Sequence, residues 1–321
     1  MSKKQIVIRE CDVPYDFENI TFLRGLATLG IFILHEGTKY NLTTIVSGMG
    51  FAVPMFFYMS AIIYGTRELN NFDYAFLNKR LRSLSNIYIP YVISASLLLI
   101  FALHYPVLQV FKQTAIDLFF LNGLFPSIIP ICGHLWFLTY LLFFYGLLII
   151  VSKLILLNNK YRYVIACLLI ALLISNICLL HKAKIYYVLG YLLLFLYSKR
   201  ILSTICYFNL VRNICLFAGI ALLIISLFFT INQNGNLMGC ITAILLIFGT
   251  YRKIVPPPLL VKYSKISMAF YLCHHILVYE LNSVLLSFVL TIFLSVIFTY
   301  FLNLNRIVKW LLSKLNENYN Y

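Results

Sequence analysis

Long apolar stretches alternate with short polar stretches along almost the whole chain. A helix that crosses a bilayer needs about 20 predominantly apolar residues, and the apolar stretches approach this length. Two of them, 185–198 and 237–250, are short for a full crossing. The pattern predicts about ten membrane-spanning helices, at residues 20–36, 44–66, 86–104, 134–152, 163–181, 185–198, 212–231, 237–250, 264–280 and 284–303.

Composition supports this prediction and excludes other classes of protein. The chain has 321 residues, of which 62% are apolar and 11% are charged. Soluble domains average about 45–50% apolar and 25% charged residues, and disordered chains are poorer still in apolar residues. A transmembrane barrel would show short alternating segments instead of long apolar runs. We therefore expect an all-α integral membrane bundle with one domain over 1–321, a cytoplasmic N-terminal segment at 1–19 and a basic cytoplasmic tail at 304–321.

The distribution of cations predicts the orientation. The chain has 25 Lys and Arg against 10 Asp and Glu, a formal net charge of +15. With the N-terminus inside, twenty cations fall on cytoplasmic segments, four fall outside, and Arg24 lies within the first span. Cytoplasmic loops carry such an excess of Lys and Arg. Both termini are thus expected in the cytoplasm, and the charge needs no nucleic-acid partner.

Four further features concern the cysteines, the N-terminus, residues 105–133 and the C-terminal tail. The eight Cys contain no C-x-x-C pair and most lie in apolar runs, so no metal or redox site is expected. The first 18 residues have no signal-peptide cleavage site, and the first span is expected in the mature protein. Residues 105–133, with three prolines, are predicted to be a re-entrant or interfacial segment on the outer face, and the tail after 303 a short amphipathic helix on the inner leaflet.

Arg24 and His35 stand out because ionisable groups inside a span are costly and often functional. Eleven helical residues separate them, so both point to one face, about 16 Å apart along the axis. The alternative is that Arg24 extends to the inner headgroups while His35 lies at the outer boundary. Glu36 is expected to be a solvated carboxylate, and Lys39 occupies the position where a zinc-binding H-E-x-x-H motif needs its second His.

Other polar residues mark three further places. Lys79, Arg80 and Arg82 lie in a predicted cytoplasmic loop, where they form either an anion site or an ordinary basic loop. His134 and Trp136 open the fourth span, where Trp is also common as an interface anchor. His274 and its neighbour His275 lie in the ninth span, and at least one of them should face protein or water. Walker-type phosphate loops and nucleophile elbows are absent from the sequence.

Taken together, these motifs resemble the membrane-bound acyltransferase family 3, the integral-membrane O-acyltransferases of bacterial envelope glycans. Arg24 and His35 match the family's R-x10-H, and Phe56-Phe57-Tyr58-Met59-Ser60 matches F-F-x-x-S, with Ala61 at the usual Gly. Lys79-Arg80-Leu81-Arg82 and Pro90-Tyr91 are similar to its basic loop and P-Y. His134 to Leu138 matches H-L-W-F-L, and Ser264 to His274 is similar to its last motif. The resemblance runs through the whole chain in order.

The resemblance implies an acyltransferase of the bacterial inner membrane that uses acyl-CoA, most often acetyl-CoA, as a co-substrate and has no bound cofactor. The acceptor is a hydroxyl of a lipid-linked or surface polysaccharide. We expect His35 to be the general base, with an acyl-His intermediate as an alternative, and Arg24 to act beside it in donor binding or electrostatics. Lys79, Arg80 and Arg82 are expected to bind the donor. The residues expected at the acceptor site or oxyanion are His134, Trp136, Ser60, Tyr271 and His274.

A transporter or flippase of a lipid-linked glycan is the main alternative, because it would share the apolar bundle and the basic inner loops. Such transporters are often built from inverted repeats, and the sequence contains no repeat of fixed period. Few charges lie within the predicted spans. Both observations favour the enzyme.

Overall fold

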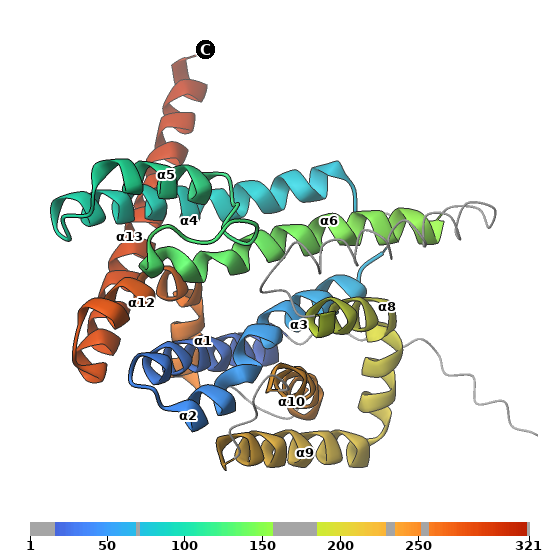
Figure 1. Cartoon of the computed structure of the whole chain (residues 1–321). Coiled ribbons are helices and arrows are strands. Elements are labelled where there is room, and N and C mark those ends of the chain that lie inside the picture. Colours follow the sequence, from blue (N-terminus) through green and yellow to red (C-terminus); the bar gives the residue numbers. More distant parts are fainter. Residues whose placement is uncertain (1–16, 69–70, 157–184, 229–234, 252–256, 320–321) are drawn as a thin grey trace, which may run out of the picture. The chain divides into compact units, whose positions relative to one another are not determined.

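The computed structural model describes residues 17–68, 71–156, 185–228, 235–251 and 257–319, and all regular structure in these ranges is helical (Figure 1). The chain divides into two compact units that are interleaved in sequence. Unit 1 comprises residues 1–68 and 184–264, and unit 2 comprises residues 69–183 and 265–321. The prediction of a single domain over 1–321 stays a prediction.

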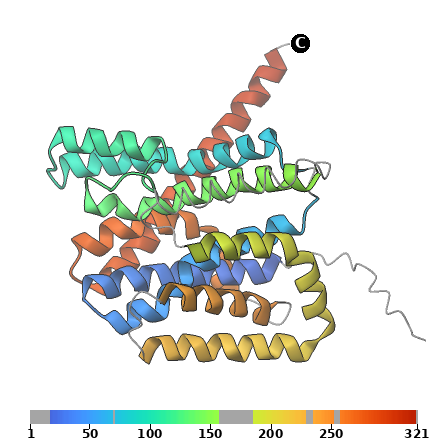
Figure 2. The same ribbon diagram turned by 45° about the vertical axis from the view of Figure 1, so that its right-hand side comes forward.

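Unit 1 is built around helix α10, Gly235–Thr250, which packs against four other elements (Figures 1 and 2). Its neighbours are α3, Ala52–Gly65; α8, Ile185–Tyr207; α9, Asn209–Phe228; and the short 3-10 helix η1, Met49–Phe51. Helix α1, Phe17–Lys39, contacts α3 and the short α2, Thr43–Gly48. Helix α11, Pro258–Lys265, ends the unit.

Glycines let the helices of unit 1 approach closely. A Cβ added at Gly239 of α10 would lie 2.6 Å from the carbonyl oxygen of Gly50, and one at Gly190 of α8 would lie 2.3 Å from the hydroxyl of Tyr58. Small residues at helix interfaces are typical of membrane bundles, because packing replaces the hydrophobic driving force there. The unit therefore depends on backbone proximity at these positions.

Unit 2 contains α4, Tyr74–Phe101; α5, Val107–Leu118; the 3-10 helix η3, Pro130–Leu135; α6, Trp136–Leu156; α12, Ser267–Glu280; and α13, Val284–Tyr319. Helix α12 packs on α13, and α5 packs on α4. Along α13, Ser287, Thr291 and Ser295 are fully buried, and each bonds a backbone carbonyl, those of Leu277, Ser287 and Thr291 respectively.

Seven of the described helices are long and apolar enough to cross a membrane. They correspond to predicted spans one to four, six, seven and ten. Span five, 163–181, lies outside the described residues. Span eight corresponds to the 16-residue α10, and span nine is divided into α11 and α12 of 8 and 14 residues. The multi-pass membrane class is confirmed, whereas the count of ten and the cytoplasmic termini stay predictions.

Several boundaries differ from the prediction. Helix α4 begins at Tyr74, because Asp73 caps it by accepting the Phe76 amide at 2.8 Å, so the basic residues 79–82 are helical and not in a loop. Helix α8 continues past Ser198 to Tyr207, and α13 runs through the predicted separate tail helix without a break. Apolar content cannot mark a helix end when polar residues continue the same helix.

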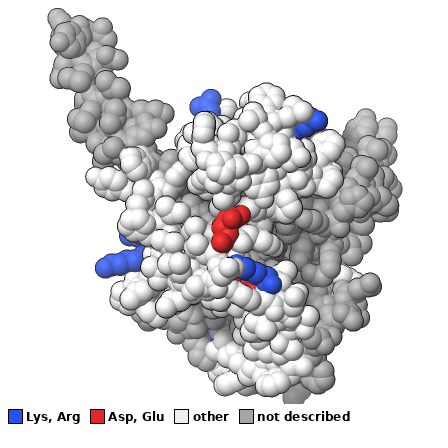
Figure 3. Space-filling view, turned by 60° about the vertical axis from the view of Figure 1, so that its left-hand side comes forward, with Lys and Arg blue, Asp and Glu red and all other residues white. Residues whose placement is uncertain are grey.

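Uncharged side chains cover most of the described surface on the face shown in Figure 3. Many large apolar side chains are exposed, including Phe217 at 68% and Leu285 at 73%. In a soluble protein such surfaces would promote association. On helices of spanning length they are suited to contact lipid.

Candidate active site

Helix α1 carries both residues of the predicted Arg-His pair. It is one continuous helix of 23 residues, so the eleven-residue spacing gives a separation of about 16 Å along its axis. Arg24 is exposed and His35 is half-buried. The hydroxyl of Thr28 donates to the Arg24 carbonyl at 2.8 Å and stays within the helix. A half-buried imidazole can be reached by a substrate while it stays fixed on a rigid element.

The expectation for Glu36 was wrong, because its side chain is only 4% exposed. Asn41 adopts a left-handed backbone conformation, φ 56°, and the chain turns back so that α2 packs against the end of α1. A Cβ at Gly37 would lie 3.1 Å from Val46 of α2. This tertiary contact beside Glu36 leaves no signal in the periodicity of the first span.

Ser60 lies in unit 1, in the interface between α3 and α8. Its hydroxyl lies 3.4 Å from that of Tyr191, and the nearby Tyr58 hydroxyl donates to the Tyr186 carbonyl at 2.9 Å. Both bonds join α3 to α8, so this motif has a clear packing role in unit 1.

The basic residues of unit 2 divide into two faces of α4. Lys79 and Arg82 are three residues apart, which places them on one side of the helix, and both are exposed. The Arg80 guanidinium instead lies over the Phe76 ring, 5.6 Å from its centroid. Lys79 and Arg82 are therefore the better placed pair for an anion such as a phosphate.

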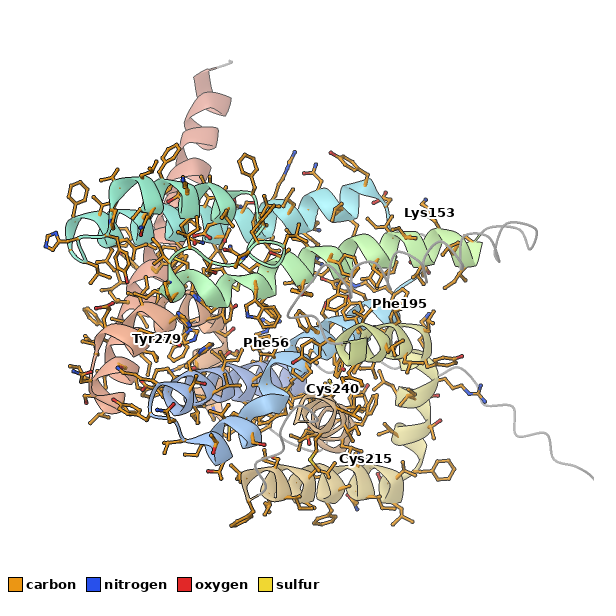
Figure 4. The ribbon with its side chains drawn as sticks, in the orientation of Figure 1. Phe56, Lys153, Phe195, Cys215, Cys240 and Tyr279 are labelled. Atoms are coloured by element: carbon orange, nitrogen blue, oxygen red, sulfur yellow. The ribbon has the colours of Figure 1, made fainter. Side chains whose placement is uncertain are left out.

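Three buried histidines form the densest polar cluster of unit 2. His134 of η3 stacks on His275 of α12, with ring centroids 4.3 Å apart and an interplanar angle of 20°. The His274 ring lies 5.5 Å from that of His134, and the exposed fractions are 2%, 4% and 0% for His134, His275 and His274. Tyr279, labelled in Figure 4, belongs to the same helix as His275, and their ring centroids lie 4.6 Å apart.

Backbone carbonyls fix these imidazoles. Nδ1 of His134 lies 3.2 Å from the Ile131 carbonyl oxygen, Nδ1 of His275 contacts the same oxygen, and Nδ1 of His274 lies 2.6 Å from the Tyr271 carbonyl oxygen. A carbonyl oxygen only accepts, so each Nδ1 carries the hydrogen and Nε2 is the basic nitrogen. In all three imidazoles Nδ1 therefore faces a backbone carbonyl.

Tyr271 connects the two elements of the cluster. Its hydroxyl donates to the His134 carbonyl at 2.5 Å, and its ring lies 5.5 Å from that of His134. Because the single hydroxyl hydrogen is used there, Tyr271 holds η3 against α12 in this arrangement. Trp136, at the start of α6, is half-buried and packs edge-on against Tyr140, 5.2 Å between centroids.

The segment before His134 is ordered by Gln113. Its side-chain amide donates to Asp117 at 2.7 Å and to Asn122 at 3.1 Å, while its oxygen accepts from the amides of Ile128 and Ile129, at 2.7 and 3.2 Å. These bonds fix the backbone that leads to Ile131. Helix α5 and this network lie in the segment 105–133, whose re-entrant or interfacial position on the outer face stays a prediction.

Asp117 lies outside the candidate spans and is 4% exposed. Burial raises the pKa of its carboxyl to about 6, against the lowering effect of hydrogen bonds with Gln113 and Asn122. Sequence reasoning missed Gln113, Asp117 and Asn122. The available signal was the one carboxylate of residues 105–133, which lies four residues after a glutamine.

An apolar cavity of about 250 Å³ lies beside the histidine cluster, between α4, α12 and α13. Tyr91, whose ring meets that of His134 edge-on at 6.5 Å, is one of its lining residues, and Cys273 is another. No group of three or more His, Cys, Asp or Glu in the described ranges is arranged to hold a metal ion.

The structure thus brings some predicted residues together. His134, Tyr271 and His274 meet in unit 2, and His275 joins them. Arg24, His35 and Ser60 belong to unit 1. A family model described as an acyltransferase domain matches residues 17–310, which covers most of both units.

The chain belongs to the membrane-bound acyltransferase family 3. It is therefore a membrane acyltransferase, and the resemblance stated on five motifs is confirmed. No curated protein and no solved structure matches the chain. In this acyltransferase most of each unit lies within the matched region, so the family's domain includes the α1 pair and the histidine cluster alike.

Proposed function

We propose that this membrane acyltransferase moves an acetyl group from cytoplasmic acetyl-CoA to a hydroxyl of a lipid-linked or surface polysaccharide in the bacterial inner membrane. The observation that carries the proposal is the family match over 17–310 together with Arg24 and His35 on one helix inside it. The resemblance to the O-acyltransferases of envelope glycans supports the choice of a polysaccharide hydroxyl as the acceptor.

His35 is the general base in this proposal. A neutral imidazole accepts a proton near pH 7, and His35 is half-buried on a rigid helix. The acceptor hydroxyl gives its proton to His35 as its oxygen bonds to the acyl carbonyl carbon. The carbon–sulfur bond then breaks, and the proton passes from His35 to the departing CoA thiolate.

The donor site uses the cations of α4. Coenzyme A is strongly anionic at its nucleotide end, and Lys and Arg bind phosphate by charge-assisted hydrogen bonds. Lys79 and Arg82 are exposed on one side of α4, in the N-terminal half of the helix. Arg80 supports them while it packs on Phe76. Arg24 contributes positive charge to the donor path.

The histidine cluster of unit 2 serves the acceptor side. Its three imidazoles are buried and held by backbone carbonyls, so their part in the proposal is to fix the shape of the acceptor site. Trp136 and the neighbouring rings offer the flat apolar faces that sugars stack on. His134 and His274 are the residues we assign to this role, with Tyr271 holding them in place.

The decisive experiment follows labelled acetyl from acetyl-CoA. The purified protein is reconstituted in proteoliposomes with lipid-linked glycan extracted from host membranes, and alkali-labile label on the glycan is counted. We expect transfer with the unchanged protein and almost none with His35→Ala at equal protein levels. Movement of glycan across the bilayer without label transfer would support the transporter instead and overturn the proposal.

A further inference from the structure

A groove of about 500 Å³ runs along the surface of unit 1 between α8 and α10, and none of its lining residues takes part in the proposed reaction. From α8 it is lined by Gly190, Leu193, Leu194, Tyr197, Arg200 and Ile201, which recur every three or four residues. From α10 it is lined by Ile244 and Phe248. Ligand sites in proteins have volumes of roughly 300–1,000 Å³, so the groove is large enough to hold one.

The polar groups of the groove lie at one end of its α8 side. Tyr197 and Arg200 are one helical turn apart, whereas the other lining residues are glycine or apolar. Tyr197 is 50% exposed and Arg200 is also exposed. The groove therefore offers a long hydrocarbon surface that ends at a guanidinium and a phenol.

The dimensions match one leaflet of a bilayer. Ten residues separate Gly190 from Arg200, which is about 15 Å of helix, half of the roughly 30 Å hydrocarbon core. Residues 186–205 of α8 form a candidate membrane span. An arginine on the outer surface of such a helix is stabilised when it reaches phosphate at the headgroup level.

The packing of α8 keeps this face open. Its contact with α3 buries Tyr191 completely and reaches Gly190, where an added Cβ would meet Tyr58, so Gly190 lies both in that contact and in the lining of the groove. Phe195 of α8 and Cys240 of α10, labelled in Figure 4, are buried, whereas Leu193 is 57% exposed. The two helices are thus fixed in unit 1 while the groove faces outward.

We propose that this groove binds one anionic phospholipid, with an acyl chain along the apolar residues of α8 and α10 and the headgroup phosphate at Arg200 and Tyr197. Acyl-CoA fits it less well, because the pantetheine amides would lie against apolar side chains without hydrogen-bond partners. The positive-inside pattern assigns the headgroup to the cytoplasmic leaflet. The proposal does not depend on the acceptor or on the transfer reaction.

Native mass spectrometry of the purified chain tests it, with phosphatidylglycerol and phosphatidylcholine of equal chain length as probes. The attraction between one cation and an anionic headgroup corresponds to about a fivefold preference for phosphatidylglycerol over phosphatidylcholine. We expect that preference in the unchanged protein and its loss in Arg200→Gln. Lys199→Gln is the matched control, because Lys199 is exposed beside Arg200 but does not line the groove, and it should keep the preference.

A second variant tests whether the apolar residues of the groove bind the acyl chain. Ile244→Trp fills the groove and should reduce binding of both lipids, whereas Arg200→Gln should affect phosphatidylglycerol alone. Equal binding of the two lipids by the unchanged protein would overturn the proposal, as would equal losses in Arg200→Gln and Lys199→Gln. Displacement of the lipid by acetyl-CoA, or a dimer that forms through this face, would also contradict it. If Ile244→Trp fails to fold, the two polar variants still decide.

Discussion

His35 of unit 1 and the three clustered histidines of unit 2 differ in how far their imidazoles are exposed. Unit 1 holds His35 half-buried on a spanning helix, whereas unit 2 buries His134, His274 and His275 and directs each Nδ1 to a backbone carbonyl. A general base must be reached by substrate and must change its protonation during the reaction. A buried imidazole in a fixed tautomer is better suited to hold and orient its surroundings. In our proposal, proton transfer therefore belongs to His35 in unit 1 and positioning to the buried histidines of unit 2.

Packing differs between the units as well. Unit 1 brings helices together at glycines such as Gly239 and Gly190, while unit 2 relies on buried polar bonds, those of Gln113 and Tyr271 among them. Close backbone packing tolerates no added atoms. Polar networks tolerate little loss of a partner. Substitutions should therefore damage the two units by different mechanisms.

The largest effect is expected at His35. His35→Ala should lower the acyl transfer rate about 10²–10⁴-fold, which is the usual contribution of a general base, at an unchanged melting temperature. His275→Gln should instead lower the melting temperature and largely retain the rate per folded molecule. Equal losses of rate in both variants, measured with labelled acetyl-CoA, would show that the division of roles between the units is wrong.

Gly239→Val tests the packing of unit 1. Its side chain would meet the backbone of Gly50 and Phe51, within 2.6 and 3.1 Å of the added Cβ, and backbone cannot move aside as a side chain can. Overpacking of this kind costs about 1–3 kcal/mol or more. We expect a clear fall in the thermal unfolding midpoint in detergent. Gly146→Ala is the control, since a Cβ there meets nothing within 4 Å, and an equal fall in both variants would contradict this account.

The polar network of unit 2 can be tested through Asp117, whose ionisation should make the stability of the folded state depend on pH. Its pKa is raised from 3.8 to about 6, so the folded state binds the proton more tightly than the unfolded state does. The resulting stabilisation is complete below about pH 4 and is lost as the pH rises through about 6. At about 1.4 kcal/mol for each pKa unit, the whole change is about 3 kcal/mol.

Thermal unfolding between pH 4 and 7.5 measures this change. Asp117→Asn should remove most of the decline in stability with rising pH, because the amide cannot ionise while its oxygen still accepts from Gln113. Glu280→Gln, at an exposed carboxylate, should keep the decline. An unaltered pH profile in Asp117→Asn would mean that another group causes it.

The smallest effect is expected at the cations of α4. Lys79→Gln with Arg82→Gln should raise the KM for acetyl-CoA about fivefold to tenfold and leave kcat nearly unchanged, since exposed charges contribute about 1 kcal/mol. Arg80→Gln should raise this KM less, because its guanidinium packs on Phe76. A larger effect of Arg80 would reverse the assignment of the two faces.

Most of the fold was predictable because apolar length alone marks a membrane span. Predicted spans near α1, α6 and α9 agree with the structure to within a few residues. Boundaries failed where polar residues continue a helix, as at Lys79 on α4 and Arg200 on α8. A positive charge near a helix end looks the same in sequence whether it lies on the helix or beyond it.

Candidate site residues were likewise predictable where a local pattern or motif marks them. Arg24 and His35 were found because a continuous helix fixes their relation, and His134 with His274 were found by motif. The burial of Glu36 and the roles of Gln113 and His275 depend on contacts between segments far apart in sequence, such as α12 with η3. Periodicity along one helix carries no information on which neighbour will cover it.

The sequence by itself determined that the chain is an all-helical membrane protein and that Arg24 and His35 share one helix face. Apolar transfer and the geometry of a single helix are local properties, so composition and spacing suffice for them. Only the tertiary structure decided that His134 and His275 meet at the Ile131 carbonyl with His274 beside them, that Gln113 orders the segment before them, and that Arg200 ends an apolar groove. Each of these depends on the register and approach of helices, which packing between distant residues sets.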